Sequence, residues 1–415
     1  GLLVFIASNP SGWKQAPTNA SVAGERQASA IRYEALGDSI TYGIPMAFRV
    51  DKSGRPRKAL TRFQGWPALL GQMLAEETGT RIEVFNNGFP GDRVGEFRTE
   101  RIPELIDAGN RSSRALLLIG TNDSNDFQPT PSGRGCVAEA CSDTYNDMMR
   151  SIIESLRQAG RETIFIATLT PAWGAELNLP YADPSNLAAA TRNARIVEYN
   201  AVIVEELLGL PGVSPGPDIY TCFLAPGTNR FSLFEDALHP NKLGYVFMAA
   251  LWRDAITGRS PTVPADSCTP PVYVLDALDP YTHGHKQNLL EEGDRYYTDE
   301  GFTLLNIPRE LADGIWVLQA NADRTSADTE YLSFDTGDEP VTVYIAFDPR
   351  GKPPVSSSHT FEPVTLSGEL AVSDTAVGAF ALVAANDVTG LVRIGATQSA
   401  AVSSTQQAYV AIVVP

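Results

Sequence analysis

A serine, a histidine and an aspartate in this sequence have the types and spacing needed for nucleophilic catalysis. Ser39 comes directly after an apolar run of strand length, residues 31–37, and open α/β sheets bind their ligands at the carboxyl ends of strands. A serine hydroxyl is a poor nucleophile near neutral pH, so a base must take its proton during attack on a carbonyl carbon. His239 could be that base, and Asp236, three positions earlier, can reach the other ring nitrogen. These three residue types can together form a catalytic triad.

Four short blocks, in order along the chain, resemble the signatures of the SGNH (GDSL-type) hydrolase family. They are GDSITYG at 37–43, NNGFPG at 86–91, GTND at 120–123 and DALHPN at 236–241. The resemblance implies a flavodoxin-like three-layer α/β/α fold with a parallel sheet. It also implies an oxyanion hole formed by the backbone N–H groups of Ser39 and Gly88 and the side-chain amide of Asn122. Each such donor typically contributes about 10²–10³ in turnover, and the chemistry requires no metal and no organic cofactor.

Each of these residues also has a purely structural interpretation. Asp236 could cap the helix that is expected after it, and the adjacent Glu235 is a rival partner for His239. Asn122 could cap a turn. Asp38 lies beside the nucleophile, but its side chain should point the other way, so we expect it to have a structural role in the turn.

The elements that would position these residues alternate between strand and helix. Such alternation predicts a parallel sheet with helices on both faces. The predicted strands are residues 31–37, 81–86, 114–120, 163–168 and 218–223. The predicted helices are residues 65–77, 101–108, 144–159, 186–208 and 242–257.

The chain is longer than a single hydrophobic core usually grows, which predicts more than one domain. We expect an N-terminal extension at 1–30, a catalytic domain at 31–258, a Pro-rich linker at 259–271 and a second domain at 272–415. In the second domain, alternating apolar runs at 314–319, 341–347, 378–384 and 408–414 predict an antiparallel β-sandwich. It resembles, more loosely, modules appended to secreted bacterial polysaccharide-acting enzymes, in GDRYYTDEGF at 293–302, IWVLQANAD at 315–323 and VYIAFDPRG at 343–351.

The four cysteines favour disulfides and therefore an oxidising compartment. Cys136 and Cys141 are five positions apart, and Cys222 with Cys268 could form a second pair, although three pairings are open. The absence of a C-x-x-C pair disfavours a zinc site. The expected disulfides lead us to expect a secreted protein, extracellular or periplasmic. Residues 1–7 are apolar and could be a signal-peptide remnant, but they lack a basic start, so this interpretation stays open. The apolar runs are shorter than the ~18 residues of a membrane-spanning helix.

The formal net charge of −17 is concentrated near the C-terminus, where residues 271–415 hold 7 Lys and Arg against 20 Asp and Glu. Such acidity argues against nucleic acid as a partner. Residues 49–62 differ, with six basic side chains and one acidic one. We expect this basic stretch, including Arg49, Arg55 and Arg57, to recognise acidic sugar chains, unless it pairs with the acidic tail. Trp173 is a candidate platform for a sugar ring or, alternatively, a packed loop residue.

Together these features predict a secreted serine esterase that removes short acyl groups, above all acetyl groups, from a polysaccharide. A lipolytic or aryl-ester hydrolase is the alternative within the same family. A glycan-binding protein without catalytic activity is the alternative from another class.

Overall fold

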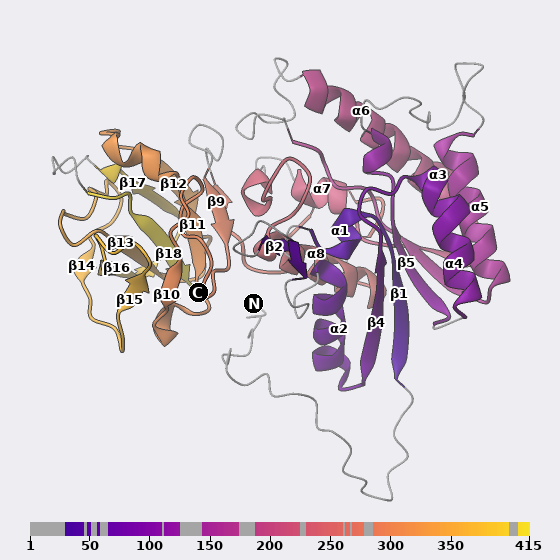
Figure 1. Cartoon of the computed structure of the whole chain (residues 1–415), viewed down its shortest axis with the longest axis horizontal. Helices are drawn as coiled ribbons and strands as arrows, with labels where there is room; N and C mark the ends of the chain where they lie inside the picture. Colours follow the sequence, from indigo (N-terminus) through magenta and orange to yellow (C-terminus); the bar gives the residue numbers. More distant parts are fainter. Residues whose placement is uncertain are drawn as a thin grey trace, which may run out of the picture. The chain divides into compact units, whose positions relative to one another are not determined.

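The computed structural model describes residues 30–44, 48–50, 56–58, 65–109, 112–124, 143–173, 187–224, 230–259, 262–265, 268–277, 285–397 and 406–415. These residues fall into two compact units, one within Ile31–Pro271 and the other within Val272–Asp279 and His283–Pro415. Figure 1 shows helices and strands mixed in the first unit, coloured indigo to pink, and mainly strands in the second, coloured orange to yellow.

The first unit is built on a parallel sheet with the strand order β4-β1-β5-β6-β7. Its strands are β1 Ile31–Gly37, β4 Ile82–Gly88, β5 Arg114–Leu118, β6 Thr163–Ile166 and β7 Val213–Pro215. The central strands β1 and β5 are buried along most of their length because helices cover both faces of the sheet. The predicted parallel α/β architecture is confirmed.

Helices lie on both faces of this sheet (Figure 1). On one face α2 (Gly65–Thr78) and α8 (Lys242–Ile256) are joined by Trp66 and Trp252, whose ring centroids are 4.8 Å apart. On the other face α5 (Tyr145–Gln158) and α6 (Leu187–Val202) are joined by stacking of Tyr145 on Tyr199 at 4.3 Å. The shorter segments are α1 Ser39–Tyr42, α3 Val94–Glu96, α4 Ile102–Asp107, α7 Ile219–Phe223, the 3₁₀ turns η2 Asn122–Ser124 and η4 Arg230–Leu233, and the π-helical turns η1 Phe97–Arg101 and η3 Ile203–Leu207. Among the helices in the described ranges, none is long and apolar enough to cross a bilayer.

The strand predicted at residues 218–223 is wrong. This segment forms α7, and the fifth strand of the sheet is β7, a few residues earlier. Its β-branched and aromatic side chains favour a strand, but Asp218 caps a helix here. The Asp218 Oδ1 accepts hydrogen bonds from the Thr221 N–H at 3.0 Å and from the Thr168 hydroxyl at 2.9 Å. This capping outweighs the β propensity of the segment, which depends strongly on context.

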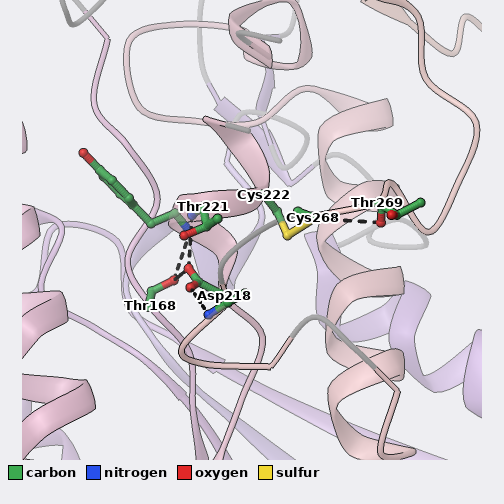
Figure 2. Close-up of a disulfide and its surroundings, with 8 residues drawn as sticks. Thr168, Asp218, Thr221, Cys222, Cys268 and Thr269 are labelled. Carbon is green, nitrogen blue, oxygen red and sulfur yellow. Dashed lines mark hydrogen bonds between the residues drawn. A yellow bond between two sulfur atoms is a disulfide. The ribbon is translucent and has the colours of Figure 1, made fainter. Parts of the chain in front are cut away.

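A disulfide joins Cys222 of α7 to Cys268, 46 positions later (Figure 2). Asp218 holds the same segment, because its Oδ2 accepts a hydrogen bond from the Ala265 N–H at 3.0 Å. The predicted pairing of Cys222 with Cys268 is confirmed. The other predicted pair, Cys136 with Cys141, lies outside the described residues.

Removal of this disulfide is expected to lower the stability of the α/β unit without changing its fold. For the 46-residue separation, the chain-entropy relation gives about 4 kcal/mol, and engineered and natural bonds commonly give about 2–4 kcal/mol. We expect the double variant Cys222→Ala/Cys268→Ala to unfold at lower guanidinium concentration, measured by tryptophan fluorescence, while its far-UV circular dichroism in buffer stays that of the wild type. Identical midpoints for the variant and the oxidised wild type would show that the bond adds no stability.

The second unit contains two antiparallel sheets. One has the order β10-β15-β16-β13-β18-β11-β9, with β14 beside β16, and the other has the order β17-β12-β8. The predicted β-sandwich is confirmed, and the four predicted runs correspond to β11, β13, β16 and β18. The strands are β8 Asp276–Ala277, β9 Lys286–Asn288, β10 Leu304–Asn306, β11 Ile315–Leu318, β12 Leu332–Asp335, β13 Val341–Phe347, β14 Glu362–Pro363, β15 Leu370–Val372, β16 Ala379–Val388, β17 Leu391–Ile394 and β18 Val410–Val414.

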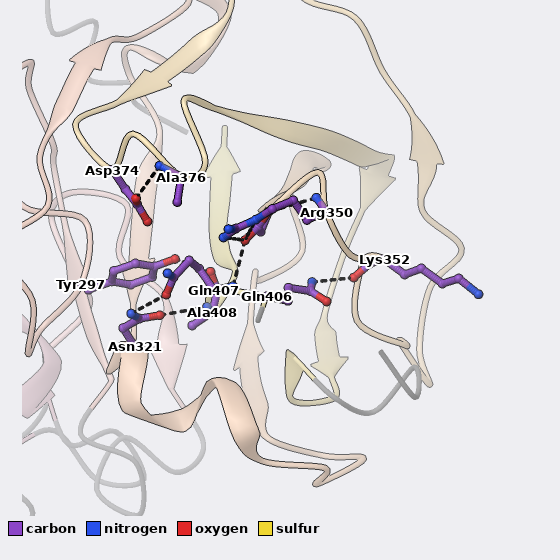
Figure 3. A network of polar contacts seen from close by, with 10 residues as sticks. Tyr297, Asn321, Arg350, Lys352, Asp374, Ala376, Gln406, Gln407 and Ala408 are labelled. Carbon is purple, nitrogen blue, oxygen red and sulfur yellow. Dashed lines mark hydrogen bonds and ion pairs between the residues drawn. The ribbon is translucent and has the colours of Figure 1, made fainter. Parts of the chain in front are cut away.

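Buried aromatic rings and a polar network hold this second unit together. Tyr297 and Trp316 are at most 1% exposed and lie in its core. Figure 3 shows the network that joins the loop after β13 to the chain before β18. Within it, the buried Asp348 carboxylate accepts hydrogen bonds from the Arg350 Nε at 2.9 Å and the Gln407 N–H at 3.0 Å. These bonds compensate the cost of burying the charge.

Candidate active site

Ser39 lies at the point where β1 ends and α1 begins. The Asp38 carboxylate caps this short helix, since its Oδ1 accepts a hydrogen bond from the Ile40 N–H at 3.0 Å. The strand can pass close to its neighbour because residue 37 is glycine: a Cβ there would lie 2.1 Å from the Leu118 carbonyl oxygen of β5. The structural role predicted for Asp38 agrees with this cap.

The loop before α8 brings a histidine and an aspartate to the serine. The His239 Nε2 lies 2.9 Å from the Ser39 Oγ, and the His239 Nδ1 lies 2.8 Å from the Asp236 Oδ2. The other carboxylate oxygen, Oδ1, accepts hydrogen bonds from the Leu238 N–H at 2.7 Å and the His239 N–H at 2.8 Å. Burial disfavours the charged form of Asp236, but these hydrogen bonds outweigh it, so the pKa of Asp236 lies below its ordinary value. The carboxylate is therefore charged at neutral pH.

Two alternatives that the sequence left open for this loop are not supported. The partner of the His239 Nδ1 is Asp236, and the side chain of Glu235 is exposed. The cap of α8 is Asn241, whose Oδ1 accepts a hydrogen bond from the Gly244 N–H at 3.0 Å. The backbone also fixes the loop, because the Trp173 N–H donates to the Ala237 carbonyl oxygen at 2.9 Å.

Asn122 and Ser39 lie in loops that follow neighbouring strands, and their role as oxyanion donors stays a prediction. Asn122 follows β5, and β1 lies between β5 and β4, so the loops after these three strands are neighbours. One hydrogen of the Asn122 amide is donated to the Asp92 carbonyl oxygen at 2.9 Å, which leaves the second for a ligand. The first backbone hydrogen bonds of α1 are donated by Tyr42 and Gly43, so the Ser39 N–H stays outside the helical pattern.

Gly88 does not fit the role that the resemblance implied for it. Its N–H donates a hydrogen bond to the Asn86 Oδ1 at 3.0 Å and is therefore already engaged. A Cβ at residue 88 would lie 2.2 Å from the Tyr42 nitrogen, so glycine is needed here because the end of β4 packs closely against α1.

Gly91, three positions later, is a better candidate for the donor than Gly88, although the sequence did not indicate it. Residues 89–92 form a tight turn in which the Asp92 N–H donates to the Phe89 carbonyl oxygen at 3.1 Å. Gly91 is exposed, has a φ of 88°, and a Cβ on it would meet no atom within 4 Å. The turn hydrogen bond does not use the Gly91 N–H. The dipeptide Pro90-Gly91 is a type II turn signal and could have indicated this turn from the sequence.

Two carboxyl groups of the site are buried. Burial raises the pKa of Asp38 to about 6, although the hydrogen bond from the Ile40 N–H opposes the shift. Burial raises the pKa of Asp123 to about 7, although the hydrogen bond that it accepts from the Val94 N–H at 3.1 Å opposes the shift. Asp123 thus joins the loop after β5 to the start of α3.

The residues predicted to bind substrate are only partly described. Arg49 and Arg57 face each other in a hairpin of β2 (Phe48–Val50) and β3 (Pro56–Lys58). Their side chains lie outside the described part of the structure, as does Arg55, so the role of the basic stretch in substrate recognition stays a prediction.

Trp173 is 2% exposed, and its ring packs edge-on against Phe231 and Phe234, with ring centroids 5.5 and 5.4 Å apart. It is a packed residue, and the prediction of a sugar platform is not supported. Within the described ranges, no group of three or more His, Cys, Asp and Glu side chains could hold a metal ion.

The first unit is similar to known proteins. Residues 35–247 match the model of the GDSL-like Lipase/Acylhydrolase family. No curated protein matches the chain. Similar solved structures include a lipase/acylhydrolase from Enterococcus faecalis, which is 19% identical in sequence and has a TM-score of 0.35. The match covers 57% of this chain and 100% of the Enterococcus chain. An acetyl xylan esterase from Geobacillus stearothermophilus has 18% identity, coverage of 56% and 97%, and a TM-score of 0.38. A carbohydrate acetylesterase from Sinorhizobium meliloti has 11% identity, coverage of 55% and 99%, and a TM-score of 0.36.

Proposed function

The chain belongs to the GDSL-like lipase/acylhydrolase family, and we propose that it is a secreted serine esterase that removes short acyl groups, above all acetyl groups, from a polysaccharide. The observation that carries the esterase part of this proposal is the continuous hydrogen-bonded chain from Ser39 through His239 to Asp236, with both distances below 3.0 Å. This is the arrangement that turns a serine hydroxyl into a nucleophile.

In the first half of the reaction Ser39 becomes acylated. The Ser39 Oγ forms a bond to the ester carbonyl carbon while its proton moves to the His239 Nε2, and the carbonyl oxygen takes up the negative charge. Asp236 stabilises the resulting imidazolium through the His239 Nδ1. The imidazolium then gives its proton to the leaving alcohol oxygen as the carbon–oxygen bond breaks. Water repeats the sequence in place of the alcohol, releases the acid and restores Ser39.

The oxyanion of each tetrahedral intermediate needs fixed hydrogen-bond donors. We assign these to the Ser39 N–H, the second hydrogen of the Asn122 amide and the Gly91 N–H, the last in place of Gly88. The hydrogen bond from Asn122 to the Asp92 carbonyl oxygen supports this choice, because it holds the amide beside the backbone of the residue that follows Gly91. Donors that are already oriented before reaction need no reorganisation when the charge develops.

The substrate class rests on the sequence. Six basic residues at 49–62 stand out in a chain of net charge −17, and they follow the serine block directly. Carboxylate or sulfate groups on a sugar chain would complement them. The likeness of the second unit to modules of polysaccharide-acting enzymes points to the same class of substrate. The disulfide between Cys222 and Cys268 supports export, because such bonds persist in oxidising compartments.

The substrate is tested by acetate released from acetylated neutral and acidic polysaccharides, alongside a short-chain chromogenic ester. We expect release from the polymers, with the acidic ones preferred. Glutamine at all six basic positions of 49–62 should lower release from acidic polymers by about tenfold, the effect of losing roughly 1.4 kcal/mol of attraction, and leave the small ester unchanged.

The other outcomes of this experiment separate the alternatives. Equal effects of the six substitutions on acidic and neutral polymers would discard the basic recognition surface. Cleavage of the small ester without release from any polymer would favour a lipolytic or aryl-ester hydrolase. No hydrolysis of either kind would favour glycan binding.

A further inference from the structure

The turn at residues 89–92 needs a fixed conformation if the Gly91 N–H is to act as a donor. Arg101 contacts both ends of this turn. The Arg101 Nε donates to the Asp92 Oδ2 at 2.8 Å. The guanidinium carbon of Arg101 lies 4.8 Å from the centroid of the Phe89 ring. Arg101 therefore contacts the first and the last residue of this four-residue turn with one planar group.

Asp92 connects Arg101 to Asn122. Its carboxylate receives Arg101, and its backbone carbonyl oxygen receives the Asn122 amide at 2.9 Å. The Asp92 side chain is 12% exposed and that of Arg101 is 27% exposed, so water screens this ion pair less than one at the surface. The two proposed donors that flank the end of β1, Gly91 and Asn122, thus depend on one shielded ion pair.

Arg101 lies in a segment of irregular helix geometry. It is the last residue of the π-helical turn η1, between α3 and α4. A π-helical turn adds one residue to the helix and rotates the side chains that follow, and such turns are frequent at functional sites. Arg98, on the same turn, instead forms an ion pair with Asp143 at 2.6 Å.

The other partners of Arg101 do not account for its position. Its NH1 lies 3.4 Å from the Glu104 Oε2, and its NH2 lies 3.9 Å from the Glu100 Oε2. These two carboxylate side chains are 62% and 58% exposed. Exposed ion pairs of this kind contribute little to the conformation of a side chain. Asp92 and Phe89 are therefore the contacts that fix Arg101.

We infer that Arg101 is a positioning residue of the oxyanion hole, which holds Gly91 and Asn122 in place through Phe89 and Asp92 without touching the substrate. This inference rests on the proposed esterase function. Lysine is a poor replacement, because its ammonium is a point charge and cannot donate to Asp92 while it lies flat over the ring.

The test compares Arg101→Gln and Arg101→Lys with Arg98→Gln, the matched control on the same π-helical turn. We expect both Arg101 variants to lose about 10–10²-fold in kcat on the small ester with KM within about twofold, since misplaced donors weaken the transition state more than the bound ester. Affinity for a short alkylboronic acid, which forms a tetrahedral adduct with serine, should fall by a similar factor. Arg98→Gln should keep the kcat and the boronic acid affinity of the wild type.

The outcomes separate this inference from the proposed function. Absence of ester hydrolysis by the wild type would overturn the proposed function. An active wild type with kcat and boronic acid affinity unchanged in both Arg101 variants would overturn the role of Arg101 alone, as would a loss confined to KM. Should the Arg101 variants not fold, Asp92→Asn keeps the carbonyl oxygen that binds Asn122 and removes the charge that binds Arg101. A kcat unchanged in folded Asp92→Asn would equally overturn the role.

Discussion

Replacement of Ser39 by alanine is expected to lower ester turnover by about 10⁴-fold or more, because no acyl-enzyme can form without the Oγ. The side chain makes a hydrogen bond of 2.9 Å to the His239 Nε2 and is 8% exposed, so it is oriented for attack before any substrate arrives. The activity that remains would come from the oxyanion donors and substrate binding, which act without the nucleophile. Hydrolysis of a short-chain chromogenic ester and acetate release from polymer should fall together.

The experiment has a matched control and an independent readout. Ser151 lies on α5 and is exposed, so Ser151→Ala removes the same atom from a site without proposed chemistry and should leave turnover unchanged. An active-site fluorophosphonate should label the wild type and Ser151→Ala at Ser39 by mass spectrometry and should not label Ser39→Ala. If Ser39→Ala retained more than about 1% of wild-type turnover, the covalent mechanism would be wrong, since triad knockouts lose far more.

The sheet could be predicted because its signals are local, and the triad could be predicted because its residues lie in short blocks that resemble those of a known family. The apolar runs of β1 and β5 indicate buried parallel strands, and the bounds of β1, Ile31–Gly37, are those predicted. Asp236 and His239 are three positions apart, a spacing that lets the carboxylate reach the ring within one turn of chain. Where local signals compete, prediction fails, as at α7, where a capping aspartate outweighs the strand propensity of the side chains that follow.

The oxyanion hole could be predicted only in part because it depends on the direction of single N–H groups. A block with two glycines does not show which amide is free, and here the Gly88 N–H is taken by Asn86. Arg101 left no signal in the sequence, since its contact with Asp92 joins residues nine positions apart and belongs to no recognised motif. The packing of Trp173 depends on Phe231 and Phe234, which lie about 60 residues later in the chain. Such contacts are decided by tertiary structure.

Replacement of Asp236 by asparagine is expected to lower kcat on the small ester by about 10⁴-fold although the shape of the side chain is kept. An asparagine can still accept the hydrogen bonds that the Leu238 and His239 N–H groups donate to Oδ1, so the loop should stay folded. At Oδ2 the substitution can place an NH₂ group against the His239 Nδ1. That group favours the tautomer protonated on Nε2, which cannot take the proton of Ser39, and it removes the charge that stabilises the imidazolium.

This substitution also distinguishes the catalytic role of Asp236 from a purely structural one. Asparagine caps turns and helices about as well as aspartate, so a residue that only capped would tolerate the change with its activity intact. The cap of α8 is in any case Asn241, which stays in place. Glu235→Gln is the matched control, because Glu235 is exposed and its neighbour already occupies the His239 Nδ1. A large loss in Glu235→Gln together with normal turnover in Asp236→Asn would transfer the role to Glu235. Loss in Asp236→Asn alone, with its thermal midpoint unchanged, would mean that the charge on this carboxylate acts in the reaction itself.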